Sequence, residues 1–384
     1  MTSFLVFIIL VLVGIAVWQL TKIFDLTQIG ASSDDAEIAN DKDNSVNGYL
    51  MFAFVGFIYV FTIYSLYAWG DLVLGTPASE HGPDYDNLMY ISFAIIFFVQ
   101  TITQFLLHYF AFKYRGKEGQ KALYFADNNK LEAIWTIIPV IVLAGLIMYG
   151  LYTWNNIMFV DEEDKQDAIV IELYAKQFGW EARYAGDDKT LGKANVRLIE
   201  GVNTLGVDLA DPAAQDDKVV TELHLPVGKK VIFKMRSQDV LHSAYMPHFR
   251  AQMNCVPGMI TQFSFTPTVT TADMRADQAI MAKVDKINKI RTQNSKKIVA
   301  EGGTALDPYT FDYLLLCNKI CGASHYNMQM KIVVDSPADF KKWLAEKPTL
   351  AQQWKDANAP APAPTEAAPA VAVDSTKVVA QVIK

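Results

Sequence analysis

Residues 317–328 read CNKICGASHYNM and place two thiols, an imidazole and a thioether within twelve positions. Sulfur and imidazole are ligands for copper, zinc or iron–sulfur clusters rather than for magnesium or calcium. Apolar runs at residues 311–316 and 328–334 flank this stretch and predict two strands. We therefore expect the ligands to lie on a tight loop between strands, where a sheet fixes their directions.

The composition divides the chain of 384 residues into an apolar part and a soluble part. Hydrophobic residues make up 51% of the chain, and they are concentrated in the first ~155 residues. The net charge of -7, without a basic stripe that carries aromatic residues, argues against nucleic-acid binding. The three cysteines are too few for a disulfide framework, and Cys255, which stands apart, is expected to be a small buried residue.

Three to four transmembrane helices are predicted by apolar segments at residues 4–20, 49–69, 88–112 and 134–154. The first segment could instead be a signal peptide. No Lys or Arg precedes it, however, and no small-residue cleavage site follows closely, so a retained span is favoured. A basic loop separates the third and fourth segments, and the positive-inside rule makes it cytoplasmic. Everything after residue 154 then lies on the far side, which in a bacterium is the periplasm.

Four regions follow from this pattern. Residues 1–48 are expected to be an N-terminal span and a cytoplasmic loop, and residues 49–160 a transmembrane region. Residues 161–348 are expected to form a periplasmic domain, and residues 349–384 an Ala/Pro-rich tail. Glu132, at the cytoplasmic mouth of the last span, is either a plain interfacial carboxylate or part of a proton path.

Short strands separated by turn residues indicate an all-β sandwich or Greek-key barrel in the soluble part. The predicted strands lie at residues 169–175, 219–223, 230–235, 260–265, 311–316 and 328–334. An insertion near residues 271–307 has apolar residues at helical spacing among many Lys and Arg. We expect either a solvated amphipathic helix lying on the barrel or a basic surface for a partner subunit or lipid head groups.

A second imidazole for the metal loop could come from His242, which follows Asp239-Val240-Leu241 at the end of a strand. The candidate set is then two Cys, two His and one Met. Zinc would use Cys2His2 and leave the Met idle, whereas a single blue copper would leave one thiolate over. A dinuclear copper centre would use every member of the set.

These blocks together resemble subunit II of haem–copper cytochrome c oxidases. The similar stretches lie between Glu132 and about Pro337: the start of the last span (residues 131–139), AKQFGW at 175–180, LPVG at 225–228, DVLHS at 239–243, and the loop at 317–328. The resemblance implies a cupredoxin-like barrel carrying two copper ions, the dinuclear centre called CuA. It also implies a multi-pass protein of the bacterial inner membrane.

The resemblance also implies roles for individual residues. Cys317 and Cys321 would bridge the coppers, with His242 and Met328 on one ion and His325 and the Lys319 carbonyl on the other. Trp180, Phe178 and Tyr184 would lie near the surface where reduced cytochrome c docks, and Glu132 would stand at a proton entrance shared with subunit I. The implied function is to accept electrons from cytochrome c and pass them to haem in subunit I. Oxygen would be reduced to water there, coupled to proton translocation, and this chain would not be catalytic alone.

Several departures from the family pattern keep alternatives open. Lys319 replaces the Glu that usually helps to hold magnesium against subunit I, so that magnesium site is expected to be missing or altered. Phe178 stands where a Trp is common. The rival readings are a copper-free quinol oxidase subunit, a structural zinc protein or assembly factor, and a nitrous-oxide-reductase-type domain. The full ligand set argues against the quinol oxidase subunit, and Met328 argues against the zinc protein. The membrane spans argue against the nitrous-oxide-reductase-type domain.

Overall fold

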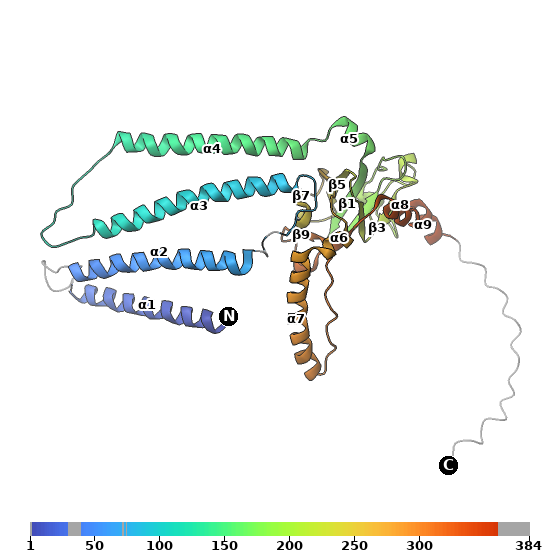
Figure 1. Ribbon diagram of the computed structural model, residues 1–384. Helices are drawn as coiled ribbons and strands as arrows, with labels where there is room; N and C mark the ends of the chain where they lie inside the picture. The colour runs from blue at the N-terminus through green and yellow to red at the C-terminus, as the bar shows by residue number, and fades with distance from the viewer. Residues whose placement is uncertain (1, 30–39, 71–72, 74, 360–384) are drawn as a thin grey trace, which may run out of the picture. The chain divides into compact units, whose positions relative to one another are not determined.

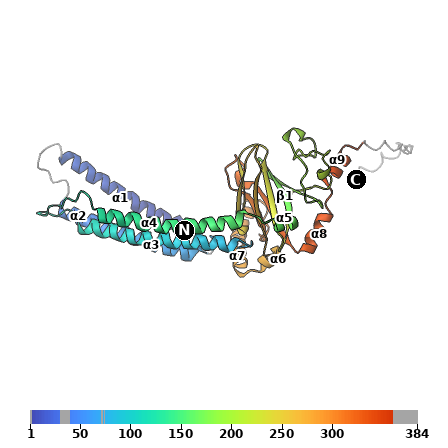
Figure 2. The same ribbon diagram turned by 90° about the horizontal axis from the view of Figure 1, so that it is seen from above.

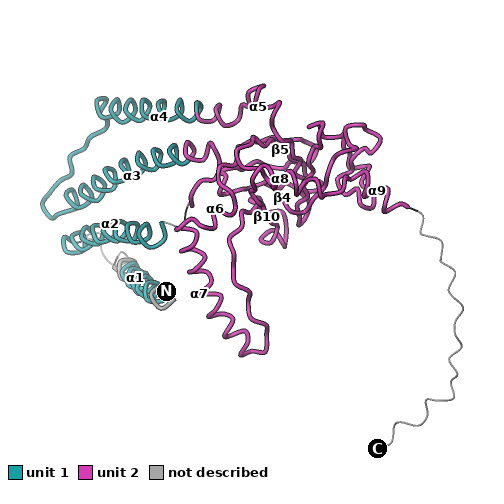
Figure 3. The backbone as a smooth tube through the Cα atoms, turned by 45° about the vertical axis from the view of Figure 1, so that its right-hand side comes forward, with its two compact units in different colours: residues 1–74, 86–152 teal, residues 75–85, 153–384 magenta. Residues whose placement is uncertain are grey.

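The computed structural model describes residues 2–29, 40–70, 73 and 75–359 (Figure 1). Over these residues the chain divides into two compact units, which Figure 3 colours separately. Residues 1–74 and 86–152 form the helical unit, and residues 75–85 and 153–384 form the second unit, called here the β-domain.

The helical unit confirms the predicted transmembrane helices. Each of the four apolar segments forms a helix long enough to cross a membrane, and apolar side chains cover its surface. The helices are longer than the predicted spans because they also include polar residues at the ends of the apolar segments. They are α1 (Thr2–Ile29), α2 (Asp41–Trp69), α3 (Gly82–Lys113) and α4 (Asn129–Met158).

Helices α2 and α3 pack closely at the end that carries the basic loop. A Cβ atom on Gly48 would lie 2.6 Å from the Phe112 ring, so this glycine allows the approach. The Phe112 ring also contacts Tyr49, with ring centroids 5.0 Å apart. The backbone N–H of Glu118 donates to Asp41 at 2.8 Å, which places the basic loop beside the start of α2. The loop and the start of α2 therefore lie at the same end of the helical unit.

The β-domain is built from two five-stranded sheets, ordered β3-β2-β1-β5-β8 and β4-β10-β9-β6-β7. Figure 2 shows the strands of this domain, with β1 labelled. Most neighbouring strands are antiparallel, but β1 pairs with β5 and β4 with β10 in parallel. This arrangement confirms the predicted cupredoxin-like all-β fold. The strands are β1 (Ile169–Lys176), β2 (Gly179–Tyr184), β3 (Lys218–Val220), β4 (Leu223–Pro226), β5 (Val231–Ser237), β6 (His242–Met246), β7 (Ala251–Cys255), β8 (Thr261–Phe265), β9 (Tyr313–Cys317) and β10 (Gln329–Asp335).

The core of the β-domain lies between the sheets and is rich in aromatic side chains. Phe249 stacks on Phe265 with ring centroids 4.8 Å apart, and Phe265 stacks on Phe233 at 5.3 Å. Alternate residues of each strand face inward, as the period of two in a strand requires. The resulting layer of packed side chains supports the loops at the ends of the sheets.

Two parts of the β-domain differ from the prediction. The expected strand at residues 219–223 is split into β3 and β4, which belong to different sheets. The expected tail begins instead with a helix, α9 (Leu350–Ala357), after α8 (Pro337–Ala345). The buried side chain of Leu350 packs with Tyr174 and Leu205, so α9 closes a small second core. Residues 360–384 of the predicted tail lie outside the described residues.

The insertion forms α6 (Thr271–Ala276) and α7 (Gln278–Ala300). The helical spacing is confirmed, but α7 does not lie on the barrel. It projects from the β-domain, and residues 301–312 return alongside it to β9 (Figures 1 and 3). The remaining short helices of the described chain are α5 (Glu162–Asp167), η2 (Val196–Leu198), η3 (Pro212–Ala214), η4 (Pro247–Phe249) and η5 (His325–Asn327).

Residues 75–85, which lead from α2 into the first turn of α3, belong to the β-domain and form an added edge of it. The N–H of Ala78 donates to the carbonyl of His248 at 2.7 Å, and the N–H of Thr268 donates to the carbonyl of Ala78 at 2.9 Å. The buried Ser79 hydroxyl donates to the carbonyl of Phe249 at 2.7 Å. The link between two membrane helices is therefore part of the β-domain.

Candidate metal centre

The loop at residues 318–328 is held by main-chain hydrogen bonds at its base and side. Strands β9 and β10 are antiparallel, and the N–H of Cys317 donates to the carbonyl of Met328 at 3.0 Å. The N–H of Asn318 donates to the carbonyl of Ser243 in β6 at 3.1 Å. These bonds fix the loop against the strand that begins with His242. The predicted loop between two strands is thus confirmed.

Five candidate ligand side chains converge around the two cysteine sulfurs. The Sγ atoms of Cys317 and Cys321 are 3.9 Å apart. His242 Nδ1 lies 3.8 Å from the Sγ of Cys317. On the other sulfur, His325 Nδ1 lies 3.6 Å and the Met328 Sδ 3.7 Å from the Sγ of Cys321. The carbonyl oxygen of Lys319 is 3.2 Å from the Sγ of Cys317, so the structure brings all six predicted ligand residues together.

His242 is fully buried, and Asp239 fixes the orientation of its ring. In the sequence, Asp239 stood out only as the first residue of the DVLHS stretch. The Nε2 of His242 lies 2.8 Å from the Asp239 Oδ1. Because a carboxylate accepts hydrogen bonds, Nε2 carries the hydrogen and Nδ1 keeps its lone pair toward Cys317. Burial raises the pKa of Asp239, but hydrogen bonds from the backbone of Gln177 and from His242 outweigh it and hold the pKa below its usual range.

The Cys321 thiol resists ionisation in the absence of a cation. Burial, followed by the charge of the neighbouring Cys317, raises the pKa of the Cys321 thiol to about 11. A metal ion favours the thiolate form, so binding would release the protons of both thiols. The donor set of two thiols, two imidazoles, a thioether and a carbonyl fits soft or borderline metals, copper among them.

The segment at residues 177–180 packs against this loop. The Gln177 side-chain amide donates to the carbonyl of Cys321. The Phe178 ring lies so close to Gly322 that a Cβ there would be 2.9 Å from it. Trp180 is buried, and its ring centroid is 6.3 Å from that of His242. This aromatic segment therefore lies beside the candidate ligands, and the predicted role of Trp180 and Phe178 in electron entry stays a prediction.

The structure corrects one predicted surface residue. Tyr184 is fully buried in the core rather than near a docking surface, because residues 180, 182 and 184 of β2 all face inward. Its hydroxyl accepts a hydrogen bond from the N–H of His224 at 2.8 Å and donates one to the carbonyl of that residue at 2.7 Å. Burial raises the pKa of Tyr184. The Tyr184 side chain links β2 to β4 inside the core, so its role is structural.

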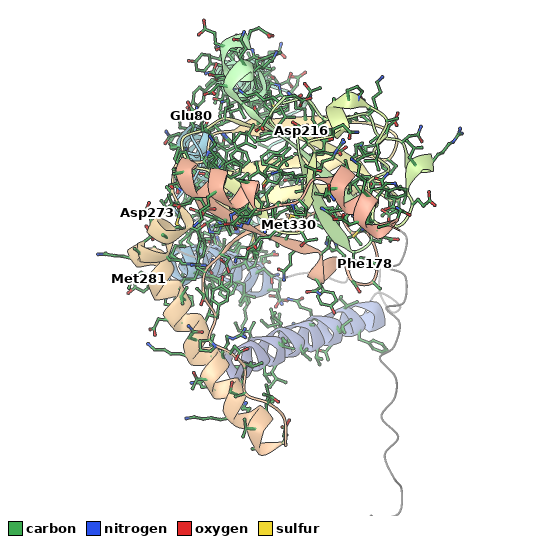
Figure 4. The ribbon with its side chains drawn as sticks, turned by 90° about the vertical axis from the view of Figure 1, so that its right-hand side faces the viewer. Glu80, Phe178, Asp216, Asp273, Met281 and Met330 are labelled. Atoms are coloured by element: carbon green, nitrogen blue, oxygen red, sulfur yellow. The ribbon has the colours of Figure 1, made fainter. Side chains whose placement is uncertain are left out.

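Two exposed apolar side chains of the metal loop, unlike Phe178, were not singled out from the sequence. Ile320 is 88% and Tyr326 is 87% exposed, and both lie on the metal loop itself. Phe178 is 39% exposed and is labelled in Figure 4. The sequence signal for Ile320 and Tyr326 was their position between ligand residues, because a large apolar side chain on an exposed loop is a candidate contact for another protein. We call Phe178, Ile320 and Tyr326 the apolar rim.

Two further predicted residues lie where their roles require exposure. The Lys319 side chain is exposed, while its carbonyl faces Cys317. Glu132 belongs to the first turn of α4 in the helical unit and is also exposed. The missing or altered magnesium site at Lys319 and the proton entrance at Glu132 stay predictions.

Two family models match the chain. The transmembrane domain of "Cytochrome C oxidase subunit II" matches residues 76–153, and the periplasmic domain of the same family matches residues 169–273. The second match ends at the base of α7, so the inserted helix separates it from the metal loop.

Similar proteins carry the same description. The alternative cytochrome c oxidase subunit 2 of Bradyrhizobium diazoefficiens is 34% identical over 278 residues, which are 72% of this chain and 84% of that protein. The cytochrome c oxidase subunit 2 of Thermostichus vulcanus is 24% identical over 304 residues, covering 73% and 80%. A solved periplasmic domain of subunit II from Bradyrhizobium japonicum is 18% identical and covers 46% of this chain and 91% of its own, with a TM-score of 0.27.

Proposed function

The chain belongs to the cytochrome c oxidase subunit II family, and from that premise we propose that it is the electron-accepting subunit of a respiratory terminal oxidase. It would accept electrons from reduced cytochrome c and pass them to haem in subunit I, where oxygen is reduced to water. Proton translocation is coupled to that reaction. The chain would act only as part of the enzyme.

The observation that carries this proposal is the pair of cysteine sulfurs 3.9 Å apart, with an imidazole nitrogen on each side. Two copper ions would be held by Cys317 and Cys321 as bridges. The other ligands would be His242 with Met328 and His325 with the Lys319 carbonyl. When bound, the copper pair would supply one-electron transfer with little change of geometry. The strands and hydrogen bonds that fix this loop supply the rigidity that such a site needs.

The protein's own residues would also guide and shield electron entry. The apolar rim offers exposed contacts for a docked electron donor, and aromatic side chains are often anchors in such contacts. Trp180 lies beneath the surface against His242, so it would separate the ligands from solvent. Asp239 would hold the His242 ring in the orientation that keeps Nδ1 available.

The remaining assignments extend this proposal. The N-terminal span and the transmembrane region at residues 49–160 would lie in the bacterial inner membrane, the rest of residues 1–48 would be a cytoplasmic loop, and the β-domain would face the periplasm. The periplasmic domain would extend through α9 rather than stop at residue 348. Subunit I and other oxidase subunits would contact the membrane helices, and Glu132 would stand at the proton entrance shared with subunit I. Cytochrome c would be the donor, whether soluble, anchored or held in a neighbouring complex.

The test compares the purified oxidase with its Cys317→Ser variant and with Cys255→Ser as the matched control. The unaltered oxidase should contain two more copper ions per complex than Cys317→Ser, together with a mixed-valence copper EPR signal. That signal and turnover with reduced cytochrome c should be lost in Cys317→Ser and kept in Cys255→Ser. Zinc in place of copper, or unchanged turnover in Cys317→Ser, would refute the proposal.

A further inference from the structure

Helix α7 and the return segment at residues 301–312 form one projecting structure, called here the arm. At 1.5 Å per residue the 23 residues of α7 extend about 35 Å. Figure 4 labels Met281 near its attached end and Asp273 in α6. Only the first turns of α7 pack into the β-domain, through the buried Ile280 and the partly buried Val284.

The return segment is fastened along one face of α7. The Asn288 side-chain amide donates to the carbonyl of Tyr309 at 3.0 Å and accepts from the N–H of Tyr309 at 2.7 Å. Arg291 donates to the carbonyl of Asp307 at 2.8 Å. Nearer the tip, Ser295 accepts from the N–H of Leu306 at 2.9 Å. Hydrogen bonds therefore hold the return segment against α7, and this segment covers one face of the helix.

The opposite face of α7 carries a stripe of lysines. At 3.6 residues per turn, five lysine positions fall on the side away from the return segment, and all five side chains are exposed. Lys289 pairs with Asp285 at 2.7 Å, whereas the other four make no ion pair with any residue that the structure describes. The chain as a whole is acidic, at -7, so this positive charge is local. The stripe consists of Lys283, Lys286, Lys289, Lys296 and Lys297.

The root of the arm is tied to the link between two membrane helices. Asp277 caps α7 by accepting from the N–H groups of Ala279 and Ile280 at 2.9 and 3.0 Å. Its other oxygen accepts from the Thr76 hydroxyl at 3.2 Å. Thr76 is seven residues beyond Trp69, the last residue of α2, so an extended chain could separate them by at most about 25 Å. The covalent connection therefore limits the distance between the root and the end of this membrane helix to about 25 Å.

We propose that the lysine stripe of the arm binds the anionic lipid head groups of the membrane that the chain's own helices span. Clusters of lysine near a membrane boundary are attracted to anionic lipid over a distance of about one Debye length, ~8 Å. The arm is long enough to place the whole stripe along that surface. This contact goes beyond the electron-transfer function and does not depend on the metal centre.

The chemistry of the stripe favours lipid over an acidic face of another protein. Protein interfaces are enriched in Arg and aromatic residues and depleted in Lys. The stripe contains only Lys, the single Arg of α7 faces the return segment, and α7 has no aromatic residue. Lysine presents a compact, flexible charge on an apolar stem, which suits mobile head groups.

The experiment places a fluorophore on the arm of the complete oxidase in lipid nanodiscs. Gln293→Cys puts the label on the exposed face between Lys289 and Lys296. We expect quenching by head-group spin-labelled lipid in discs that contain phosphatidylglycerol. Quenching should be lost in discs of phosphatidylcholine alone, and lost in about 0.5 M salt, where the Debye length falls below ~5 Å.

Two sets of lysine substitutions distinguish the effect of the lysine stripe from the effect of the overall charge of the β-domain. Changing Lys283, Lys286, Lys296 and Lys297 to Gln should abolish the quenching. Changing four exposed lysines elsewhere on the β-domain to Gln (Lys193, Lys341, Lys342 and Lys355) should leave it intact. Equal quenching in neutral and anionic discs would overturn the proposal. So would carbodiimide cross-links from the stripe to carboxylates of another oxidase subunit that persist in neutral discs.

Discussion

At the scale of single residues, a missing side chain lets the metal loop pass beside the aromatic segment. Gly322 has a φ of +142°, and a Cβ there would lie 2.9 Å from the Gln177 amide nitrogen and from the Phe178 ring. Gly322→Ala should therefore destabilise the β-domain by about 1–3 kcal/mol and lower its metal content. Urea denaturation and elemental analysis would measure both effects.

The matched control for that substitution is Gly179→Ala. A Cβ on Gly179 meets nothing within 4 Å, and its φ is not in the left-handed region. It lies in the same aromatic segment, so it reports any general sensitivity of that segment. Equal losses of stability and metal in the two variants would show that the close contact at Gly322 has no special role.

Cys255 and Cys317 should differ in reactivity in the metal-free protein. Cys255 is fully buried below the candidate metal centre, and burial raises the pKa of its thiol to about 12. Its reactive thiolate is therefore scarce at about pH 8, while Cys317 is partly exposed. Alkylation with iodoacetamide, followed by mass spectrometry, should modify Cys317 and spare Cys255 until the protein is unfolded. Modification of both at one rate would contradict this assignment.

Most ligand residues could be predicted because they lie close together in the sequence. The residues that position the ligands could not be predicted in this way. Residues 317–328 carry four candidate ligands in a single loop. The role of Asp239 depends on where β6 places His242, and the sequence does not state that position. Tyr184 was misplaced although the signal existed. Trp180 and Tyr184 are four residues apart, and the two-residue period of a strand puts both on one face, here the buried one.

At the scale of elements, a buried ion network joins β1, β2 and the loop before β3. Arg183 donates to Glu172 at 2.6 Å and to Asp217 at 2.8 Å. The N–H of Gly192 also donates to Asp217, at 3.1 Å. Burial raises the pKa of Asp217 from the ordinary 3.8 to about 6, although Arg183 opposes the shift. The folded state therefore binds a proton on Asp217 more readily than the unfolded state does.

This shift predicts how stability changes with pH. Between about pH 4 and 6 the folded state holds the proton that the unfolded state has lost, so lowering the pH stabilises folding. Relative to Asp217→Asn, the unaltered protein should gain about 2 kcal/mol between pH 6 and 4, and almost nothing above about pH 7. Urea denaturation of residues 153–359 at several pH values would measure the difference. The exposed Asp187→Asn serves as control, and a gain on raising the pH would contradict the prediction.

Elements whose partners are distant in sequence were the hardest to predict. The run at residues 219–223 looks like one strand, but its two ends pair with β2 in one sheet and β10 in the other. Likewise, α9 is short and polar, and its position depends on Leu350 filling a gap beside Leu205. By contrast, the membrane helices and the metal-loop hairpin follow from local pattern, and the structure has them all.

At the scale of the whole molecule, the chain joins its two units through residues 75–85, which are part of the β-domain although they connect two membrane helices. Ala78 is fully buried there and shares two main-chain hydrogen bonds with the β-domain. A fragment that begins at residue 153 would lose these contacts. The β-domain is therefore expected to depend on a segment that precedes it by two membrane crossings.

Fragment stability tests this dependence. We would compare residues 153–359 with a second fragment in which residues 75–85 are joined to residue 153 by a Gly/Ser linker in place of the two spans. The linked fragment restores the buried Ala78 and the hydrogen bonds that residues 75–85 make with the rest of the β-domain, at least four of them from or to Ala78, Ser79 and Glu80. Together these contacts should add about 2 kcal/mol. Its Tm should therefore be higher by roughly 4–8 °C, measured by differential scanning calorimetry on the metal-free forms. Ala78→Asp in the linked fragment buries a charge at this contact and should remove the gain. Equal Tm values for the two fragments would mean that the segment is held in place by the membrane helices alone.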